Sequence, residues 1–277
     1  MADEAPRRRN MGLIVALAVI AGLLVLCCLL ALVGAIAFSR FRVRDGVIGW
    51  PQIPGRNGAV EATRELDRAF PVQGAVVLDV RNPVGDVTIE GTEDAQVVVE
   101  SLVRAFGASV EEAQRNVDAV DVIIAEEGVG RIRVEARVPQ GQRFQGRSPT
   151  VRLIIRVPRE VSLQVANNVG RVEVTDVVGS ATITADVGDV VLRGFTLRDD
   201  TRIEVGVGRI LVALPADSAF TVDAQTNVGD IDTAFDVRGA AEERIPPGDR
   251  LQGEVGANPQ VELRLRTNTG DITLAAD

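Results

Sequence analysis

Histidine and tyrosine are absent from this chain of 277 residues, and its only two cysteines are Cys27 and Cys28. Both cysteines lie in a long apolar run, so the rest of the chain has no disulfide, no thiol nucleophile and no cysteine zinc site. The missing imidazole removes the commonest general acid–base group and a common metal ligand. A Gly-x-Ser-x-Gly nucleophile elbow is also missing. These absences argue against an enzyme, and we predict no catalytic residue, no metal site and no cofactor.

Lysine is absent too, and aromatic residues make up only 3% of the chain. All 30 basic side chains are therefore arginines, set against 39 acids for a net charge of −9. Residues 1–44 hold six arginines and two acids (+4), whereas residues 45–277 hold 24 arginines and 37 acids (−13). An acidic body repels nucleic acid and anionic lipid, and few rings leave few platforms for stacking bases or sugars. We therefore predict no nucleic-acid partner.

Residues 11–39 form an apolar run without a single charge between Gly12 and Phe38. A bilayer core needs about 20 apolar residues, so the run predicts a single transmembrane helix that acts as a signal-anchor. It would follow a short cytoplasmic tail at residues 1–10 and precede a Pro- and Gly-rich juxtamembrane linker at 40–60. Ala35-Ile36-Ala37 also fits a signal-peptide cleavage pattern, although the run exceeds the usual 7–15 residues. Cleavage after Ala37 is the open alternative.

The charges on either side of this run are almost balanced, with three arginines before it and three after it: Arg7, Arg8, Arg9, Arg40, Arg42 and Arg44. The positive-inside rule is therefore close to a tie. An N-terminal signal-anchor can export a long following domain, so we expect a single-pass protein of the cell membrane with its body outside the cytoplasm.

A short motif recurs along residues 61–277: an apolar residue, glycine, Asp or Arg, and then alternating apolar residues. From Gly170 the glycines follow one another at steps of 18, 20, 21 and 41 residues. A period near 20 is typical of a solenoid. Glycine permits the positive φ of a tight turn, and the alternation after it indicates a half-buried strand. The predicted turn glycines are Gly85, Gly130, Gly170, Gly188, Gly208, Gly229 and Gly270.

These patterns predict an all-β fold, a β-solenoid or β-helix-like stack of short strands with repeats of about 20 residues. Each repeat would contain a corner, a short strand and a looser return. The Asn or Asp two residues before several glycines is expected to cap the corner; these residues are Asn168, Asp186, Asn227 and Asn268. The Pro-containing stretch 236–253 is interpreted as a degenerate coil with an outward excursion.

The residue after the corner glycine alternates in charge through Arg171, Asp189, Arg209 and Asp230. Stacked coils lie roughly 4.8 Å apart, which would align these side chains in one row. Opposite charges in neighbouring strands attract by roughly 0.2–1 kcal/mol per pair, so we predict a charge ladder that helps to set the register. A row of calcium sites is the sharper alternative, but each turn offers too few carboxylates for an ion that needs six or more oxygens.

Two further segments interrupt the repeats. Ser109 followed by Glu112 is the capping-box pattern, which predicts one short helix over about residues 110–118. The polar stretch 139–150 predicts an exposed loop. There Phe144 lies between Arg143 and Arg147, a possible contact site in an otherwise ring-poor chain. The plain alternative is a single Phe tucked under its own loop.

The body resembles the putative-adhesin family of bacterial envelope proteins, a domain of unknown function. The resemblance covers about residues 60–277 and rests on three features: the run Asn82-Pro83-Val84-Gly85-Asp86-Val87-Thr88-Ile89-Glu90-Gly91, the helix around Ser109, and the serial Val-Gly-Asp-Ile corners. It implies a β-solenoid-like domain on the outer face of a membrane, and it carries over no catalytic residue. Some similar domains are thought to act in envelope-stress signalling.

Three functions remain open at this point. The first is a non-enzymatic, adhesin-like binding domain held at the membrane, whose ligand is an unknown envelope protein or polymer. The second is an envelope-stress regulatory or structural protein that works through protein–protein contacts or lateral self-association, for example at an exposed strand edge. The third is a carboxylate-dependent polysaccharide hydrolase, but the acids are so numerous that no catalytic pair stands out.

Overall fold

The computed structural model describes residues 59–139, 147–242 and 247–277, all of which belong to one compact unit. Residues 1–58 lie outside these ranges. They include the predicted tail at 1–10, the predicted span at 11–39 and all but the last two residues of the predicted linker at 40–60. Within them, no helix combines the length and the apolar composition that crossing a bilayer requires. The described part is mostly strand with one short helix, which confirms the all-β prediction at that level.

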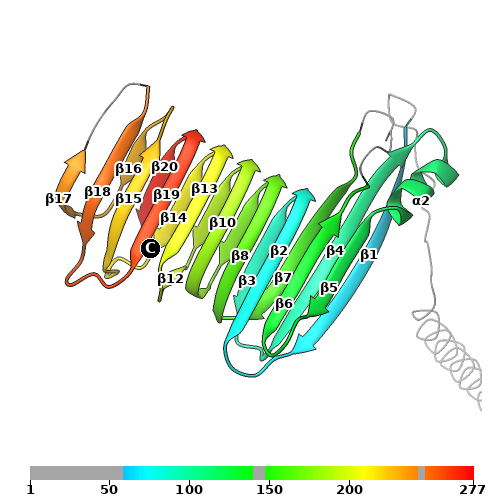
Figure 1. The fold of residues 1–277 in the computed structure, drawn as a ribbon, viewed down its shortest axis with the longest axis horizontal. Coiled ribbons are helices and arrows are strands. Elements are labelled where there is room, and N and C mark those ends of the chain that lie inside the picture. Colours follow the sequence, from blue (N-terminus) through cyan, green and yellow to red (C-terminus); the bar gives the residue numbers. More distant parts are fainter. Residues whose placement is uncertain (1–58, 140–146, 243–246) are drawn as a thin grey trace, which may run out of the picture. The chain divides into compact units, whose positions relative to one another are not determined.

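Two sheets pack face to face, and both are built mainly from parallel strands (Figure 1). Sheet A has nine strands in the spatial order β1 (Val60–Pro71), β4 (Gln96–Gly107), β7 (Thr150–Pro158), β3 (Val87–Thr92), β9 (Val172–Thr175), β11 (Val190–Arg193), β14 (Ile210–Leu214), β20 (Ile272–Ala276) and β16 (Ile231–Thr233). Sheet B has eleven, in the order β17 (Val237–Glu242), β18 (Asp249–Val255), β15 (Phe220–Thr226), β19 (Glu262–Thr269), β13 (Thr201–Val207), β10 (Val178–Val187), β8 (Glu160–Val169), β2 (Val76–Val84), β6 (Arg131–Arg137) and β5 (Asp121–Glu126), with β12 (Thr196–Leu197) beside β10.

Each coil of the stack crosses from sheet B to sheet A through a glycine corner. Strand β10 runs along sheet B, turns at Gly188, and continues as β11 in sheet A. Coils made of β2–β3, β8–β9, β13–β14, β15–β16 and β19–β20 follow the same plan. The predicted looser return is therefore wrong, because the segment before the corner is a full strand, often longer than the one after it. It is extended because its alternate residues, such as Ala181 and Ile183, face the core.

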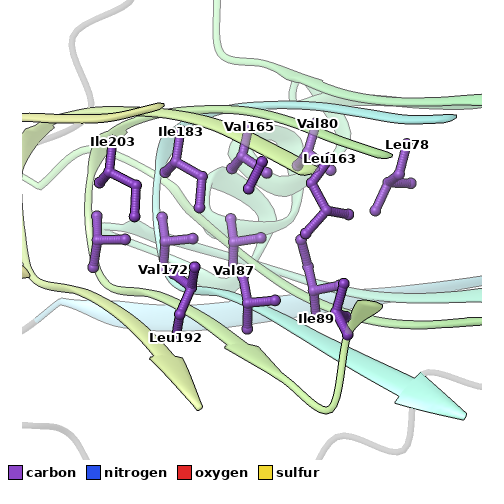
Figure 2. Packing of buried hydrophobic residues seen from close by; sticks show 14 of the residues in the cluster. Leu78, Val80, Val87, Ile89, Leu163, Val165, Val172, Ile183, Leu192 and Ile203 are labelled. Atoms are coloured by element: carbon purple, nitrogen blue, oxygen red, sulfur yellow. The ribbon is translucent and has the colours of Figure 1, made fainter. Parts of the chain in front are cut away.

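The core lies between the two sheets and consists almost wholly of aliphatic side chains. Ile203, Ile183 and Val165 of sheet B face Val172 and Val87 of sheet A, as the rows in Figure 2 show. Each of these residues is 3% exposed or less. Burial of one such side chain contributes about 1.5–3 kcal/mol, and similar layers repeat from coil to coil. The alternating apolar residues of the sequence thus form two facing rows of buried side chains, one from each sheet, along the stack.

The spatial order of the coils departs from their order in the chain. Strands β19 and β20, the last in sequence, lie between the coil β13–β14 and the coil β15–β16. The coil at Gly229 is therefore displaced outward by one position. The predicted ladder order, in which Asp230 follows Arg209 directly, is therefore wrong, because β20 pairs with β14 and separates it from β16.

Antiparallel strands close both ends of the stack. Strand β18 pairs antiparallel with β15, and β17 pairs with β18 across a bulge. The predicted degenerate coil at 236–253 is therefore wrong, since β17 and β18, its described strands, pair antiparallel and cap the end of the stack. At the other end, β1 and β4 pair antiparallel beside helix α2 (Val110–Asp118).

Helix α2 matches the predicted range 110–118. The Ser109 side chain accepts a hydrogen bond from the Glu112 backbone N–H, and the Glu112 carboxylate accepts one from the Ala108 N–H. These contacts satisfy backbone donors that a helix start leaves unpaired. Ala113 and Val117 then bury their side chains.

Candidate functional site

Six of the seven predicted turn glycines lie in one file along an edge of the stack, which we call the corner edge. Their φ angles run from +132° to +150°. A Cβ atom on any of them would lie only 2.0–2.3 Å from a backbone carbonyl oxygen of the neighbouring coil. Glycine is thus required twice, for its φ and for the close approach of the next coil. In spatial order the six are Gly85, Gly170, Gly188, Gly208, Gly270 and Gly229.

Gly130 does not belong to this file. It lies in the turn between the antiparallel strands β5 and β6, with φ +72°. Its carbonyl accepts a hydrogen bond from the Val77 N–H at 2.8 Å. The pattern Val-Gly-Arg-Ile-Arg-Val indicates a glycine with positive φ followed by a strand. A β-hairpin turn contains such a glycine just as a coil corner does, so the pattern does not distinguish the two.

Backbone hydrogen bonds run from coil to coil straight through the corners. The Gly170 N–H donates to the Val187 carbonyl at 2.9 Å, and the Val172 N–H donates to the Asp189 carbonyl at 3.0 Å. The same two bonds recur at the next corners along the stack. The corner edge is therefore part of the hydrogen-bonded framework, and its side chains stand on a rigid support.

Two buried asparagines brace the corners from inside. Asn82 donates through Nδ2 to the carbonyls of Gly85 and Val151, both at 3.0 Å, and Asn167 donates to the Gly170 carbonyl at 2.9 Å. Each lies three residues before its glycine and is at most 2% exposed. The sequence analysis did not predict these two asparagines. Their position on the inward-facing side of a strand could have indicated a buried polar group that must form hydrogen bonds.

The predicted capping residues, which lie two positions before the glycine, instead carry exposed side chains: Asn168, Asp186, Asn227 and Asn268. Alternation along a strand explains the error, because a shift of one residue moves a side chain from the core to the surface.

Asp189 is the centre of the predicted charge ladder. Its Oδ1 accepts a hydrogen bond from the Arg209 N–H at 3.0 Å, and its Oδ2 lies 3.1 Å from the Arg209 guanidinium and 3.6 Å from that of Arg171. The Arg209 N–H bond contributes most to lowering the pKa of Asp189, followed by the Arg209 and Arg171 guanidinium groups, whereas burial acts in the opposite direction. The carboxylate is therefore held in its charged form.

The ladder also extends beyond the predicted residues at its near end. Asp86 accepts a hydrogen bond from the Arg171 N–H at 3.0 Å, and Arg152 lies 4.0 Å from the Asp86 carboxylate. Two more rungs, one acidic and one basic, thus precede Arg171.

At the far end the prediction placed Asp230 next to Arg209. Asp271 takes that place instead, since the Ile210 N–H donates to the Asp271 carbonyl at 3.0 Å. Asp230 lies one coil further out, where its N–H donates to the Asp271 carboxylate at 3.1 Å. The ladder in spatial order is Arg152, Asp86, Arg171, Asp189, Arg209, Asp271 and Asp230.

A stripe of exposed valines runs beside the ladder, one residue before four of the six corner glycines; half-buried Val84 and exposed Thr269 take this place at the other two. Val169, Val187, Val207 and Val228 are 43–51% exposed, although most aliphatic side chains in the described strands are buried or half-buried. Strand pairing sets Val187 directly between Val169 and Val207. We call this row the valine stripe. Together with the ladder it makes the corner edge a repeating surface of apolar and charged side chains.

The predicted contact loop falls mostly outside the described residues, since Arg143 and Phe144 belong to the undescribed stretch. The guanidinium carbon of Arg147 lies 5.1 Å from the ring centre of Phe106, a cation–π contact with a ring at the end of β4. The structure thus pairs Arg147 with a partner that the sequence did not suggest.

Across residues 59–139, 147–242 and 247–277, no three His, Cys, Asp or Glu side chains gather to hold a metal ion. The most crowded charged group is Asp223, whose carboxylate lies 2.5 Å from Arg266, 3.7 Å from Arg264 and 3.8 Å from Arg250. This group joins three neighbouring strands on the outer face of sheet B, and its geometry fits a structural ion network.

Comparisons with known proteins agree with this architecture. Residues 159–275 match the family model Toastrack DUF4097, and no curated protein matches the chain. A putative cell adhesion protein from Clostridium sporogenes shares the fold with a TM-score of 0.56 at 13% identity, over 78% of this chain and 100% of its own.

Two further solved structures align less well. A putative adhesin from Bacteroides fragilis has a TM-score of 0.30 at 10% identity, over 76% of this chain and 97% of its own. A putative lipid binding protein from Parabacteroides distasonis has a TM-score of 0.27 at 12% identity, over 77% and 96%.

Proposed function

We propose that this protein, whose residues 159–275 match the Toastrack DUF4097 family model, is a membrane-anchored, non-enzymatic binding protein whose contact surface is the corner edge. The observation that carries the proposal is the register of that edge. Six coils present the ladder, and four of them also present the valine stripe, at a repeat of about 4.8 Å on a backbone that is hydrogen-bonded throughout. Such a surface offers many equal contacts and suits an extended macromolecule better than a small molecule.

The exposed valines support this role. Contiguous exposed apolar side chains are unusual on a soluble surface and often mark contact sites. The charges beside them are largely paired within the ladder, so they can flank an apolar contact with little further desolvation cost. An enzyme is a poorer fit, because the chain lacks histidine and because the edge presents valines and charges that are already paired.

A pull-down tests the binding role. Tagged full-length protein, in detergent-solubilised envelope, should retain an envelope protein or polymer, and the variant Val187→Glu/Val207→Glu should lose it. Thr182→Glu/Thr184→Glu is the matched control: it adds two charges on the outer face of β10, and both threonines are exposed. Equal retention by both variants, or no retained component at all, would count against the corner edge as the contact surface.

The membrane anchor and its orientation are part of the proposal. The apolar run at 11–39 would hold the chain in the cell membrane with residues 61–277 outside the cytoplasm. Protease added to intact cells or to cells with a permeabilised outer layer should digest the body, whereas a cytoplasmic control protein stays whole. Full protection of the body until the cytoplasmic membrane is lysed would refute this orientation.

A further inference from the structure

We propose that the corner edge binds a second copy of this chain, edge to edge and antiparallel, about a two-fold axis between the coils of Arg171 and Asp189. The inference rests on the binding role proposed for this edge and names its partner. It starts from the order of charges in the ladder, which only the folded chain reveals.

Six successive rungs alternate strictly in sign. Read backwards, the row of six becomes acid, base, acid, base, acid, base, so an antiparallel copy places an opposite charge against every rung. Asp189 then faces the partner copy's Arg171, and Arg209 faces the partner copy's Asp86. In a two-fold interface the same surface of both copies must be complementary to itself. A row of alternating charges with an even number of rungs is complementary to its own reversed copy. The six rungs are Arg152, Asp86, Arg171, Asp189, Arg209 and Asp271.

The valine stripe fits the same axis. Val169 precedes the Arg171 rung by two residues, and Val187 precedes the Asp189 rung by two, so the axis brings Val169 of one copy against Val187 of the other. Both are β-branched, more than 40% exposed and held on paired strands. Their contact would remove apolar surface from water at the centre of the interface, with the charged pairs around it.

Charge also argues against anionic partners for this edge. The complete ladder holds four aspartates and three arginines on a body of net charge −13, which disfavours anionic lipid and nucleic acid.

Three of the four terminal strands of the two sheets are poor sites for pairing between copies. Arg64 and Arg68 of β1 lie opposite buried Val103 and Val99, which places them on the inner face of the sheet. Inward-pointing charge on an edge strand disfavours addition of another strand. Strand β17 is bulged, and the Ile231 N–H of the short strand β16 already donates to Asp249. End-to-end growth at these three strands is therefore disfavoured; β5 is the fourth terminal strand.

The interface should be weak. Five steps of about 4.8 Å make the row about 24 Å long. An edge of this length buries less than the about 800 Å² per partner of a stable complex. We expect dissociation constants above about 10 μM in solution, and tighter pairing where a shared membrane confines the chains.

Charge reversal tests the inference. Full-length chains in nonionic detergent, labelled with donor or acceptor fluorophores, are titrated up to about 1 mM, the range in which such contacts saturate. Arg171→Asp should weaken pairing of like chains roughly tenfold or more, and so should Asp189→Arg, because each sets like charges across the axis. A mixture of the two variants should regain wild-type energy transfer, since the carboxylate introduced in one variant then faces the guanidinium introduced in the other.

The mixture separates contact between chains from damage within a chain. Each variant breaks its own ladder, and mixing cannot repair that, so recovery on mixing requires a direct contact. The pair Arg209→Asp and Asp86→Arg repeats the test at a second rung if one of the first variants fails to fold. Wild-type chains that show no energy transfer, or folded variants that do not recover on mixing, would overturn the self-pairing. Either result leaves the pull-down of an envelope component to decide the binding role separately.

Discussion

At the scale of single residues, the corner glycines carry the strictest requirement in the molecule. Their φ of +132° to +150° lies well beyond the left-handed region near +50° that Asp176 and Asn258 occupy, so φ alone already favours glycine strongly. The carbonyl of the neighbouring coil adds a second restriction, because it occupies the space that a Cβ would need. Only a hydrogen atom fits at this position in the stack.

Gly188→Ala should destabilise the fold by about 3 kcal/mol or more, because its Cβ would lie 2.0 Å from the Gly170 carbonyl oxygen at φ +144°. For a domain of this size the midpoint of thermal unfolding should fall by roughly 6–12 °C, measured by circular dichroism. Gly74→Ala is the control: its φ is +79°, but no atom lies within 4 Å of the added Cβ. Gly74→Ala should cost less, and similar losses in both variants would contradict the added cost of the close carbonyl and the wider φ at Gly188.

Asp189→Asn tests the ladder through pH. The folded-state pKa of Asp189 is lowered, so its carboxylate stabilises the fold above the unfolded-state pKa, which is about 3.9. At pH 7 the variant should be less stable by about 1 kcal/mol. That difference should shrink as pH falls from 4 through the lowered pKa, where both states bind the proton.

Urea unfolding of both proteins between pH 7 and pH 3 measures this difference. Asp94→Asn, in an exposed turn, is the control and should leave stability within about 0.5 kcal/mol at every pH. A stability difference that stays constant down to pH 3 would contradict the role of the charged carboxylate.

At the scale of elements, local signals predicted strands and helix well, but not their partners. Helix α2 was predictable because its cap, its first-turn acids and its apolar positions are contiguous in sequence. The strand before each corner was underestimated, because segments such as β10 expose threonines on one face and bury small residues on the other. The Asn82 brace was hard to predict because one of its acceptors is the Val151 carbonyl, 69 residues away. Asn167 bonds to Gly170 within its own corner, so its signal was local and was overlooked.

Ser109→Ala should cost about 1 kcal/mol, because it removes the side chain that accepts from the Glu112 N–H. Thermal unfolding followed by circular dichroism should show a midpoint lower by roughly 2–4 °C. Ser109→Asn keeps a capping oxygen and should retain most of the stability. Equal destabilisation by Ala and Asn would mean that the serine acts through packing and not as a cap.

At the scale of the whole molecule, the last coil in sequence is an interior coil in space. Strand β20 has hydrogen-bonded neighbours on both sides, β14 and β16, whereas β16 pairs only with β20 among the described strands. The C-terminal segment thus completes the stack from within, and the coil at Gly229 becomes the outer one.

Native-state hydrogen exchange should reveal this order. Amides of β20 (Ile272–Ala276) should exchange as slowly as those of mid-stack β11, and those of β16 (Ile231–Thr233) should exchange faster, since an edge strand opens more easily. Mass spectrometry of peptides from the three strands measures the rates. Fast exchange in β20 together with slow exchange in β16 would favour winding in simple chain order.

The sequence by itself determined the repeating unit. Three features are encoded in neighbouring residues: a glycine that needs positive φ, an alternation of buried and exposed positions, and a capping box. Corners, strands and the helix therefore follow from local chemistry. Only the tertiary structure decided which coil lies beside which, that β17 and β18 close the end as antiparallel strands, and that Asp271 precedes Asp230 in the ladder. These choices depend on pairing between segments far apart in the chain, and chemically similar corners leave no local signal to distinguish one partner from another.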